Sequence, residues 1–463
     1  MHFTQYYLDC LSQASYLIGD TTTGRAVVVD PRRDVQEYLD DAAANGLTIE
    51  LVIETHFHAD FLSGHLELAA ATGAEIGFGE VAETEFPSRK LRDGERISLG
   101  EVTLEIRATP GHTPESISIV VYEHPDDEVP YGVLTGDTLF IGDVGRPDLL
   151  GSIGFTADEL ARDLHRSLHE KLLTLPDATR VFPAHGAGSA CGKNLSTETQ
   201  STIGEQRRTN YAVQPMTPDE FVDLVTADQP AAPEYFPYDA ILNRKDRALL
   251  DEGDAPAPVT LDQLLDEQAA GAVVIDTREP DVFAKGHLRG SVNIGISGRF
   301  AEYVGTVVGP DQPVLLVGDE AAVAEAKLRM GRIGYDRVVG ALTDLEAAMV
   351  ANPDRVDRAS QLTAVALREA RDRGQAMALI DVRNPGEVKL GRIDGAEHIP
   401  LAHLRDHLAE LDRHVPTVVY CAGGYRSSIA ASLLRSAGFA DVSDLIGGYG
   451  AWLVMDQPTS AVG

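Results

Sequence analysis

The chain of 463 residues contains only three cysteines, Cys10, Cys191 and Cys421, and they lie far apart. This spacing excludes a disulfide framework and an all-cysteine metal site, and it fits thiols in a reducing compartment. The sequence has no run of about eighteen apolar residues, so no transmembrane helix is expected. Its first residues show no basic stretch followed by an apolar one, so no secretory signal is expected and the predicted location is the cytoplasm.

Positive charge is also scarce. Lysine and arginine total 39 against 72 acidic residues, which gives a formal net charge of −33. A general nucleic-acid-binding surface needs a basic face, so that class of partner is excluded. The acidity fits either a halophilic host or an acidic cytosolic protein, and both interpretations stay open. The length implies about two to four domains.

The first 245 residues alternate short β-type runs with helical stretches. Strands are expected at 26–30, 51–55, 101–110, 116–123, 131–137 and 179–185, and helices near 34–45, 63–72 and 156–174. Thr156 stands three residues before Glu159, which is the pattern of a capping box. The chemically distinctive residues follow strand ends, where α/β and sandwich folds hold their sites.

The second half of the chain repeats itself. VVIDTREPDVFAKGHLRGSVNI, which begins at 273, matches ALIDVRNPGEVKLGRIDGAEHI, which begins at 378, and 313–342 matches 416–446. Units of this size can each hold a core, so the repeat indicates two copies of a small α/β domain with a parallel sheet. We therefore predict the following organisation: a first domain at 1–248, a linker at 249–258, and the two copies at 259–352 and 360–457.

Four histidine and aspartate motifs in the first domain predict a metal site. THFHAD contains His56, His58 and Asp60, and the other motifs contribute His112, Asp137 and His185, each after a strand and in a Gly- or Pro-marked loop. Imidazole and carboxylate ligands suit a divalent transition metal. The set resembles the metallo-β-lactamase superfamily, whose motif is His-x-His-x-Asp-His followed by distant His, Asp and His. The resemblance implies an αββα sandwich with the site at the edge of two sheets.

One position departs from that pattern. Phe61 stands where binuclear zinc hydrolases of glyoxalase II type have a histidine that helps to hold the second metal. Two histidines and one carboxylate around one metal are the ligand set of non-haem Fe(II) oxygenases. The chain here is similar to the persulfide dioxygenases, also through LFIGDVGRPDLLG (139–151) and RRTNYA (207–212). That resemblance implies one Fe(II) per chain held by His56, His112 and Asp137, with His58, Asp60 and His185 orienting ligands or water.

Two further residues of this domain are candidates for the substrate site. Arg146 could pair with a substrate carboxylate through its planar fork, and the alternative is a loop arginine bridging Asp143 or Asp148. Cys191, six residues after His185, could relay sulfur if its loop reaches the metal, and a small buried thiol is the alternative.

The last copy carries a cysteine loop, TVVYCAGGYRSS, in which six residues run from Cys421 to Arg426. It resembles the rhodanese active-site loop. Backbone N–H groups around the sulfur and a helix N-terminus would stabilise a thiolate or persulfide at Cys421. The remaining residues predicted to bind substrate there are Gly423, Gly424, Tyr425 and Ser427, and Ser427 is expected to cap the helix. In the first copy Val317 or Gly318 takes the cysteine position, so that copy is expected to be inactive and to serve as a scaffold or an oligomer contact.

The expected function combines both sites. Iron would oxidise a low-molecular-weight thiol persulfide with O2 to sulfite, and Cys421 would exchange sulfur with sulfite or thiosulfate. The alternatives are a zinc thioester hydrolase of glyoxalase II type joined to a sulfurtransferase, and a persulfide carrier or sensor. Homo-oligomer formation is expected because large members of the superfamily often self-associate.

Overall fold

The computed structural model describes residues 1–149, 154–229 and 232–456. Residues 150 and 151 of the 139–151 motif, and residue 457 at the expected end of the last domain, lie outside the described residues. The chain divides into two compact units: Met1–Glu252 with Gly331–Gly334, and Gly253–Met330 with Tyr335–Gly463. Among the described residues, no helix is both long enough and apolar enough to span a membrane.

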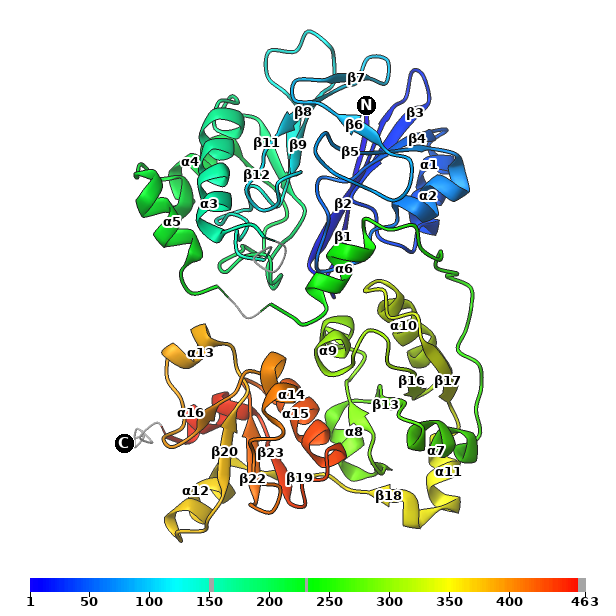
Figure 1. Cartoon of the computed structure of the whole chain (residues 1–463), viewed down its shortest axis with the longest axis vertical. Coiled ribbons are helices and arrows are strands. Elements are labelled where there is room, and N and C mark those ends of the chain that lie inside the picture. The colour runs from blue at the N-terminus through cyan, green and yellow to red at the C-terminus, as the bar shows by residue number, and fades with distance from the viewer. Residues whose placement is uncertain (150–153, 230–231, 457–463) are drawn as a thin grey trace, which may run out of the picture. The chain divides into compact units, whose positions relative to one another are not determined.

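The first unit contains two six-stranded sheets that pack face to face (Figure 1). One sheet is formed by β1 His2–Leu8, β2 Gln13–Asp20, β3 Arg25–Val29, β4 Thr48–Ile53, β5 Glu75–Gly79 and β6 Arg89–Leu91. The other is formed by β7 Arg96–Ser98, β8 Thr103–Ala108, β9 Ile117–Tyr122, β10 Gly132–Gly136, β11 Arg180–Pro183 and β12 Ser201–Thr202. Alternate residues of both sheets, such as Ile53 and Leu104, form the core between them.

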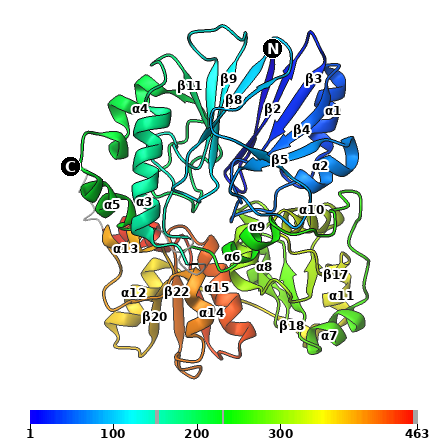
Figure 2. The same cartoon turned by 45° about the horizontal axis from the view of Figure 1, so that its top comes forward.

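Helices cover the outer face of each sheet (Figure 2). On the first sheet lie α1 Gln36–Ala44 and α2 His65–Thr72, which bury Tyr38 and Leu68 against the strands. On the second lie α3 Ala157–Arg166, a π-helical turn at Ser167–Leu172, α4 Ile203–Thr209 and α5 Pro218–Thr226. The helix α6 Phe236–Leu242 follows. The layers therefore form the expected αββα sandwich, and the expected Thr156–Glu159 capping box is confirmed at the start of α3.

The second unit contains two separate small sheets, one for each sequence copy. The first is β15-β13-β16-β17, from β13 Val273–Asp276, β15 Val292–Asn293, β16 Val314–Val317 and β17 Val338–Leu342. The second is β19-β23-β22-β20-β21, from β19 Ser360–Leu362, β20 Ala378–Asp381, β21 Glu397–His398, β22 Thr417–Tyr420 and β23 Val442–Leu445. All pairs in both sheets are parallel, as the repeat predicted.

The helices of the second unit follow the same order in both copies. The first copy has α7 Leu261–Ala269, α8 Pro280–Lys285, α9 Phe300–Val307, α10 Glu320–Gly331 and α11 Leu345–Ala351. The second has α12 Ala364–Asp372, α13 Pro385–Lys389, α14 Leu404–His407, α15 Tyr425–Ser436 and α16 Gly448–Asp456. A short antiparallel pair, β14 His287–Leu288 with β18 Val356–Asp357, completes the unit.

The duplication extends to individual side-chain contacts. Arg278 pairs with Asp276 at 2.6 Å in the first copy, and Arg383 pairs with Asp381 at 2.6 Å in the second. Each arginine also donates to a carbonyl oxygen eight residues later, that of Gly286 and that of Gly391. The same arginine–aspartate ion pair therefore stands at the end of the corresponding strand, β13 or β20, of each copy.

Candidate active sites

The metal-ligand candidates of the first unit all lie in loops that follow strands. His56 and His58 come after β4, His112 after β8, Asp137 after β10 and His185 after β11. All are buried. The loops can approach closely because glycine stands at the contact: a Cβ atom on Gly145 would lie 1.9 Å from the Asp137 carbonyl oxygen.

Three of these side chains converge on one point. One ligand atom each from His56, His112 and Asp137 lies within 4.8 Å of the others. The Asp137 Oδ2 atom is 3.7 Å from His56 Nε2 and 3.4 Å from His112 Nε2. The structure thus brings together the three residues that the sequence resemblance assigned as iron ligands.

Hydrogen bonds on the far side of each imidazole fix its orientation. Thr55 Oγ1 donates its proton to Asp30 and lies 2.9 Å from His56 Nδ1. Because the hydroxyl proton is already used, Thr55 Oγ1 accepts the proton carried by His56 Nδ1. His112 Nδ1 lies 2.9 Å from the Arg146 carbonyl oxygen, which can only accept. Both Nε2 lone pairs therefore face the common point, which is the tautomer that a metal ligand needs.

The donor atoms at this point fit a divalent cation. His56 Nε2 and Asp137 Oδ2 are buried and have no hydrogen-bond partner among the residues that the structure describes. Burial alone would raise the pKa of Asp137, but the neighbouring His185 and His56 outweigh it and hold that pKa well below its usual range. An ionised carboxylate and two neutral imidazoles are a suitable ligand set for a first-row transition metal.

His185 connects Asp137 to a second carboxylate. Its Nδ1 lies 2.6 Å from Asp137 Oδ1, and its Nε2 lies 2.8 Å from Asp60 Oδ2. Burial lowers the pKa of His185, but Asp137 and Asp60 outweigh burial and raise it well above its usual value. A cation at this position holds the Asp137 carboxylate in place.

His58 lies on the other side, against acidic side chains that the sequence did not single out. Its Nε2 is 3.2 Å from Asp30 Oδ1 and 3.7 Å from Glu54 Oε2. Burial, followed by the charge of Asp30, raises the pKa of Glu54 well above its usual value. His58, Asp60 and His185 also form a group of possible ligand atoms within 4.8 Å.

Phe61 lies next to the group formed by His58, Asp60 and His185. The ring is fully buried, and its centroid lies 4.3 Å from that of His58 and 6.4 Å from that of His185. A phenyl ring offers no ligand atom, so the second metal position of binuclear relatives lacks one donor here.

Cys191 reaches the metal-ligand cluster. Its sulfur, Asp137 and His185 each place a ligand atom within 4.8 Å of the others. Burial, followed by the charges of Asp60 and Asp137, raises the pKa of the Cys191 thiol well above its usual value. The condition set by the sequence, that this loop comes close to the metal ligands, is met.

Arg146 makes the contact that the sequence left as the alternative to substrate binding. Its Nε and Nη2 each donate to Asp148 at 2.7 Å, and its Nη1 donates to the Ala190 carbonyl at 3.0 Å. Its backbone carbonyl is the group that orients His112. The nearby Asp143 connects the same loop to the segment after Cys191, because its Oδ2 accepts from the backbone N–H groups of Lys193 and Asn194.

The Cys421 loop has the expected form. Cys421 is buried at the end of β22, and the Gly424 N–H group donates to its sulfur at 3.1 Å. Gly424 has φ of 117°, a conformation that favours glycine. The expectation that Ser427 caps α15 is wrong: the helix begins at Tyr425, and the Ser427 hydroxyl donates to the Gly424 carbonyl.

Arg426 pairs with a glutamate that was not among the site residues predicted from the sequence. Its Nη1 and Nη2 donate to the two carboxylate oxygens of Glu387 at 2.7 and 2.8 Å. Burial raises the pKa of Glu387, but Arg426 outweighs burial and lowers it below its usual value. Glu387 lies in the repeated segment that begins at 378, but nothing in that segment indicates that its partner is Arg426, 39 residues later.

The first copy, called the silent copy below because it lacks the cysteine, has a glycine at the equivalent position. The register pairs Asp276 with Val317 and Asp381 with Tyr420, so Gly318 occupies the position of Cys421. A Cβ atom on Gly318 would lie 2.2 Å from Thr277 Oγ1. The register thus selects Gly318 from the two residues that the sequence allowed.

Comparison with known families agrees with this architecture. The metallo-beta-lactamase superfamily matches residues 8–185, and the rhodanese-like domain matches 259–343 and 363–454. The chain belongs to the metallo-β-lactamase superfamily and carries two rhodanese-like domains after the first domain.

Individual relatives carry different descriptions. Human mitochondrial persulfide dioxygenase ETHE1 is 30% identical over 217 residues, which cover 46% of this chain and 75% of the human protein. A probable metallo-hydrolase from Burkholderia pseudomallei is 30% identical over 249 residues, covering 46% of this chain and 81% of that protein. A solved metallo-β-lactamase structure from Staphylococcus aureus is 34% identical, covers 74% of this chain and 98% of its own, and has a TM-score of 0.67.

Proposed function

We propose that this protein is a non-haem Fe(II) persulfide dioxygenase coupled to a rhodanese-type sulfurtransferase. The observation that carries the proposal is the convergence of His56, His112 and Asp137, with two buried atoms that lack hydrogen-bond partners among the described residues. Phe61 in place of a second-metal ligand favours one metal ion. The similarity to human persulfide dioxygenase and the rhodanese-like domains support a sulfur substrate.

The chain's own residues would hold one iron ion and leave positions open for substrate. His56 and His112 would bind through Nε2, and Asp137 through Oδ2, because the other atoms of these groups are bonded elsewhere. Bound iron would supply a place where the terminal sulfur of R-S-SH and O2 meet. The overall reaction consumes R-S-SH, O2 and one water, and yields R-SH, sulfite and two protons.

Polar groups beside the ligands would orient the reactants. His185 would fix the Asp137 carboxylate and could hold a proton between Asp60 and Asp137. Cys191 would stand next to the reacting sulfur, and transfer of that sulfur to its thiol would form a Cys191 persulfide and release R-SH. Arg146 would position His112, and it would contact a substrate carboxylate only by exchanging its pairing with Asp148.

The second half-reaction would take place at Cys421. A second R-S-SH molecule would give its outer sulfur to the Cys421 thiolate and leave as R-SH. The Cys421 persulfide would then give that sulfur to sulfite, which yields thiosulfate and the Cys421 thiolate without any change in electron count. The Gly424 N–H group beside the sulfur would stabilise the anionic forms. Linking both sites in one chain raises the effective concentration of the shared sulfite.

Oxygen consumption tests the iron reaction. Protein loaded anaerobically with Fe(II) should consume O2 when glutathione persulfide is added, whereas the zinc-loaded protein and Asp137→Ala should not. Uptake should scale with iron content up to one ion per chain. Thioester hydrolysis by the zinc-loaded protein without O2 uptake would move the first domain to the hydrolase alternative.

Product analysis tests the coupling. Wild-type protein given persulfide and O2 should form thiosulfate, while Cys421→Ser should accumulate sulfite instead. Equal thiosulfate yields from the two proteins would refute the coupling and leave the two sites independent.

A further inference from the structure

Tyr425, inside the catalytic loop, binds the silent copy. Its hydroxyl donates to the Gly295 carbonyl oxygen at 2.6 Å, although 130 residues separate the two. A Cβ atom on Gly298 would lie 2.4 Å from the Tyr425 ring, so glycine there leaves room for the ring. The Tyr303 ring of α9 lies 5.5 Å from the Tyr425 ring, centroid to centroid.

The contact continues along α15 as far as Ser432. The Ser428 hydroxyl donates to Asn293 Oδ1 at 2.7 Å, and the Asn293 N–H group donates to Ser432 Oγ at 2.9 Å. Asn293 is itself fixed, because its side-chain amide donates to the carbonyl oxygens of Asp276 and Arg278. All three residues of this clasp are buried.

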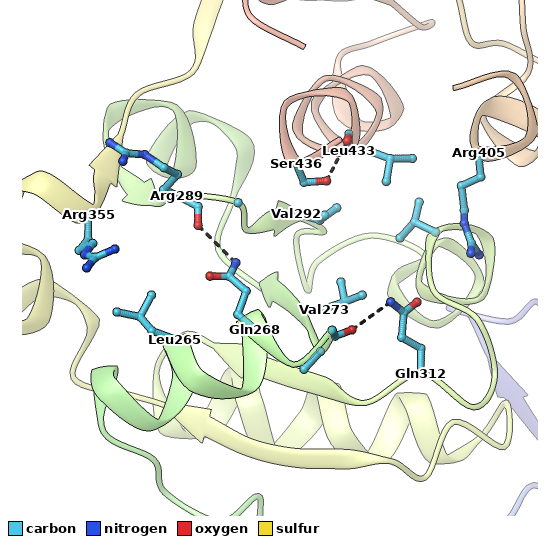
Figure 3. A pocket seen from close by; sticks show the side chains of 14 residues that line it. Leu265, Gln268, Val273, Arg289, Val292, Gln312, Arg355, Arg405, Leu433 and Ser436 are labelled. Carbon is cyan, nitrogen blue, oxygen red and sulfur yellow. Dashed lines mark hydrogen bonds between the residues drawn. The ribbon is translucent and has the colours of Figure 1, made fainter. Parts of the chain in front are cut away.

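Past Ser432 the two copies leave space between them. A cavity of about 520 Å³ opens there, lined by Leu433 and Ser436 of α15 and by first-copy residues such as Val292 and Gln268 (Figure 3). The hydrogen bonds to the first copy therefore run from Tyr425, which follows the Cys421 loop directly, to Ser432.

We propose that the silent rhodanese copy is a positioning element for Cys421, which holds the catalytic loop through Tyr425 and the Asn293 clasp. The inference rests on the sulfurtransferase part of the proposed function. Gly424 donates the N–H···S contact to Cys421, and the next two residues are Tyr425, whose hydroxyl is anchored, and Arg426, which is paired with Glu387. Fixing Tyr425 therefore fixes the direction of the Gly424 N–H group at the sulfur. Tyr303 of the silent copy also lies close to the loop: burial is the main cause that raises the pKa of Tyr303, and the charges of Arg426 and Cys421 are among the smaller causes that act on it.

Three full-chain variants test the role of the anchor. Tyr425→Phe removes one buried hydrogen bond and keeps the ring, so turnover of thiosulfate with cyanide should fall about fivefold while KM changes little. Gly298→Ala alters only the silent copy and should lower turnover at least as much. Tyr335→Phe is the matched control, because its hydroxyl also donates to a backbone carbonyl, that of Val308, in the silent copy.

The outcomes separate the inference from the function on which it depends. Equal turnover by wild type, Tyr425→Phe and Gly298→Ala would overturn the positioning role. An equal fall in Tyr335→Phe would also overturn it, because the effect would then be general destabilisation. Absence of sulfur transfer in the wild type would refute the proposed function itself. Iron-dependent O2 uptake should remain unchanged in all three variants.

Discussion

Replacement of Asp143 should loosen the loops around the metal ligands. Its Oδ2 accepts from the backbone N–H groups of Lys193 and Asn194 at 2.8 and 2.6 Å. Its Oδ1 accepts from the Tyr211 hydroxyl at 2.6 Å and from the Val144 N–H group at 2.9 Å. This carboxylate, which is 1% exposed, thus links the GDVGRPD loop to the loop of Cys191.

Asp143→Asn keeps the shape and removes half of the acceptors. The amide oxygen can still accept from Lys193 and Asn194, but the amide nitrogen then faces the Val144 N–H group, which cannot accept. Loss of the charge-assisted bonds and one unsatisfied buried donor should cost about 2–3 kcal/mol. Because 1.4 kcal/mol corresponds to a factor of ten, local opening should increase roughly 30- to 150-fold.

Hydrogen–deuterium exchange measures that opening directly. Amide groups at 139–149 and 190–196 should exchange faster by this factor in Asp143→Asn, and those of β13 and β20 should not change. Tyr211→Phe removes only one of the four bonds and should give a smaller increase. Exchange within threefold of wild type in Asp143→Asn would refute the assignment of Asp143 as the link between the loops.

Other predictions concern the remaining buried charges and the closed metal position. Glu67→Gln should destabilise the first unit by about 3–5 kcal/mol in calorimetry, because Arg33, which is fully buried, loses its 2.9 Å partner; an unchanged transition temperature would contradict this. Burial raises the pKa of Glu67, but Arg247 and Arg33 outweigh burial and lower the pKa below its ordinary 4.5. The contribution of the ionised Glu67 to the stability of the wild-type protein should therefore be complete above pH 4.5 and be lost as the pH falls through the lowered pKa. Glu387→Gln should lower the KM for thiosulfate, because Arg426 loses its competing carboxylate, and a higher KM would show that the pair holds the loop instead. Phe61→His should raise the zinc content above one ion per chain, and unchanged zinc binding would show that the ring does not close the second position.

Local patterns in the sequence predicted the elements well. The apolar run 51–55 corresponds to β4 at Thr48–Ile53, and the 131–137 run corresponds to β10 at Gly132–Gly136. The capping box at Thr156 and the repeated strand at 273 and 378 also have the expected form. Such features depend on neighbouring residues or on direct repetition, and both are visible in one chain.

Contacts between distant segments were beyond the sequence patterns. Nothing near Tyr425 indicates that its hydroxyl binds Gly295, and nothing near Arg146 decides between Asp148 and a substrate. Ser427 has the residue type of a cap, but the αL conformation of Gly424 places the helix start earlier. The partner of a polar side chain is set by tertiary packing, so residue type alone predicts that a partner exists and not which one.

The most direct test of the central claim is the ratio of sulfite formed to O2 consumed by Fe(II)-loaded Cys421→Ser protein given glutathione persulfide. This variant lacks the sulfur-transfer step and keeps the first unit intact. The account predicts one sulfite for each O2, with uptake proportional to bound iron and absent from the same variant loaded with zinc. Persulfide turnover without O2 consumption, or equal activity with zinc, would contradict it.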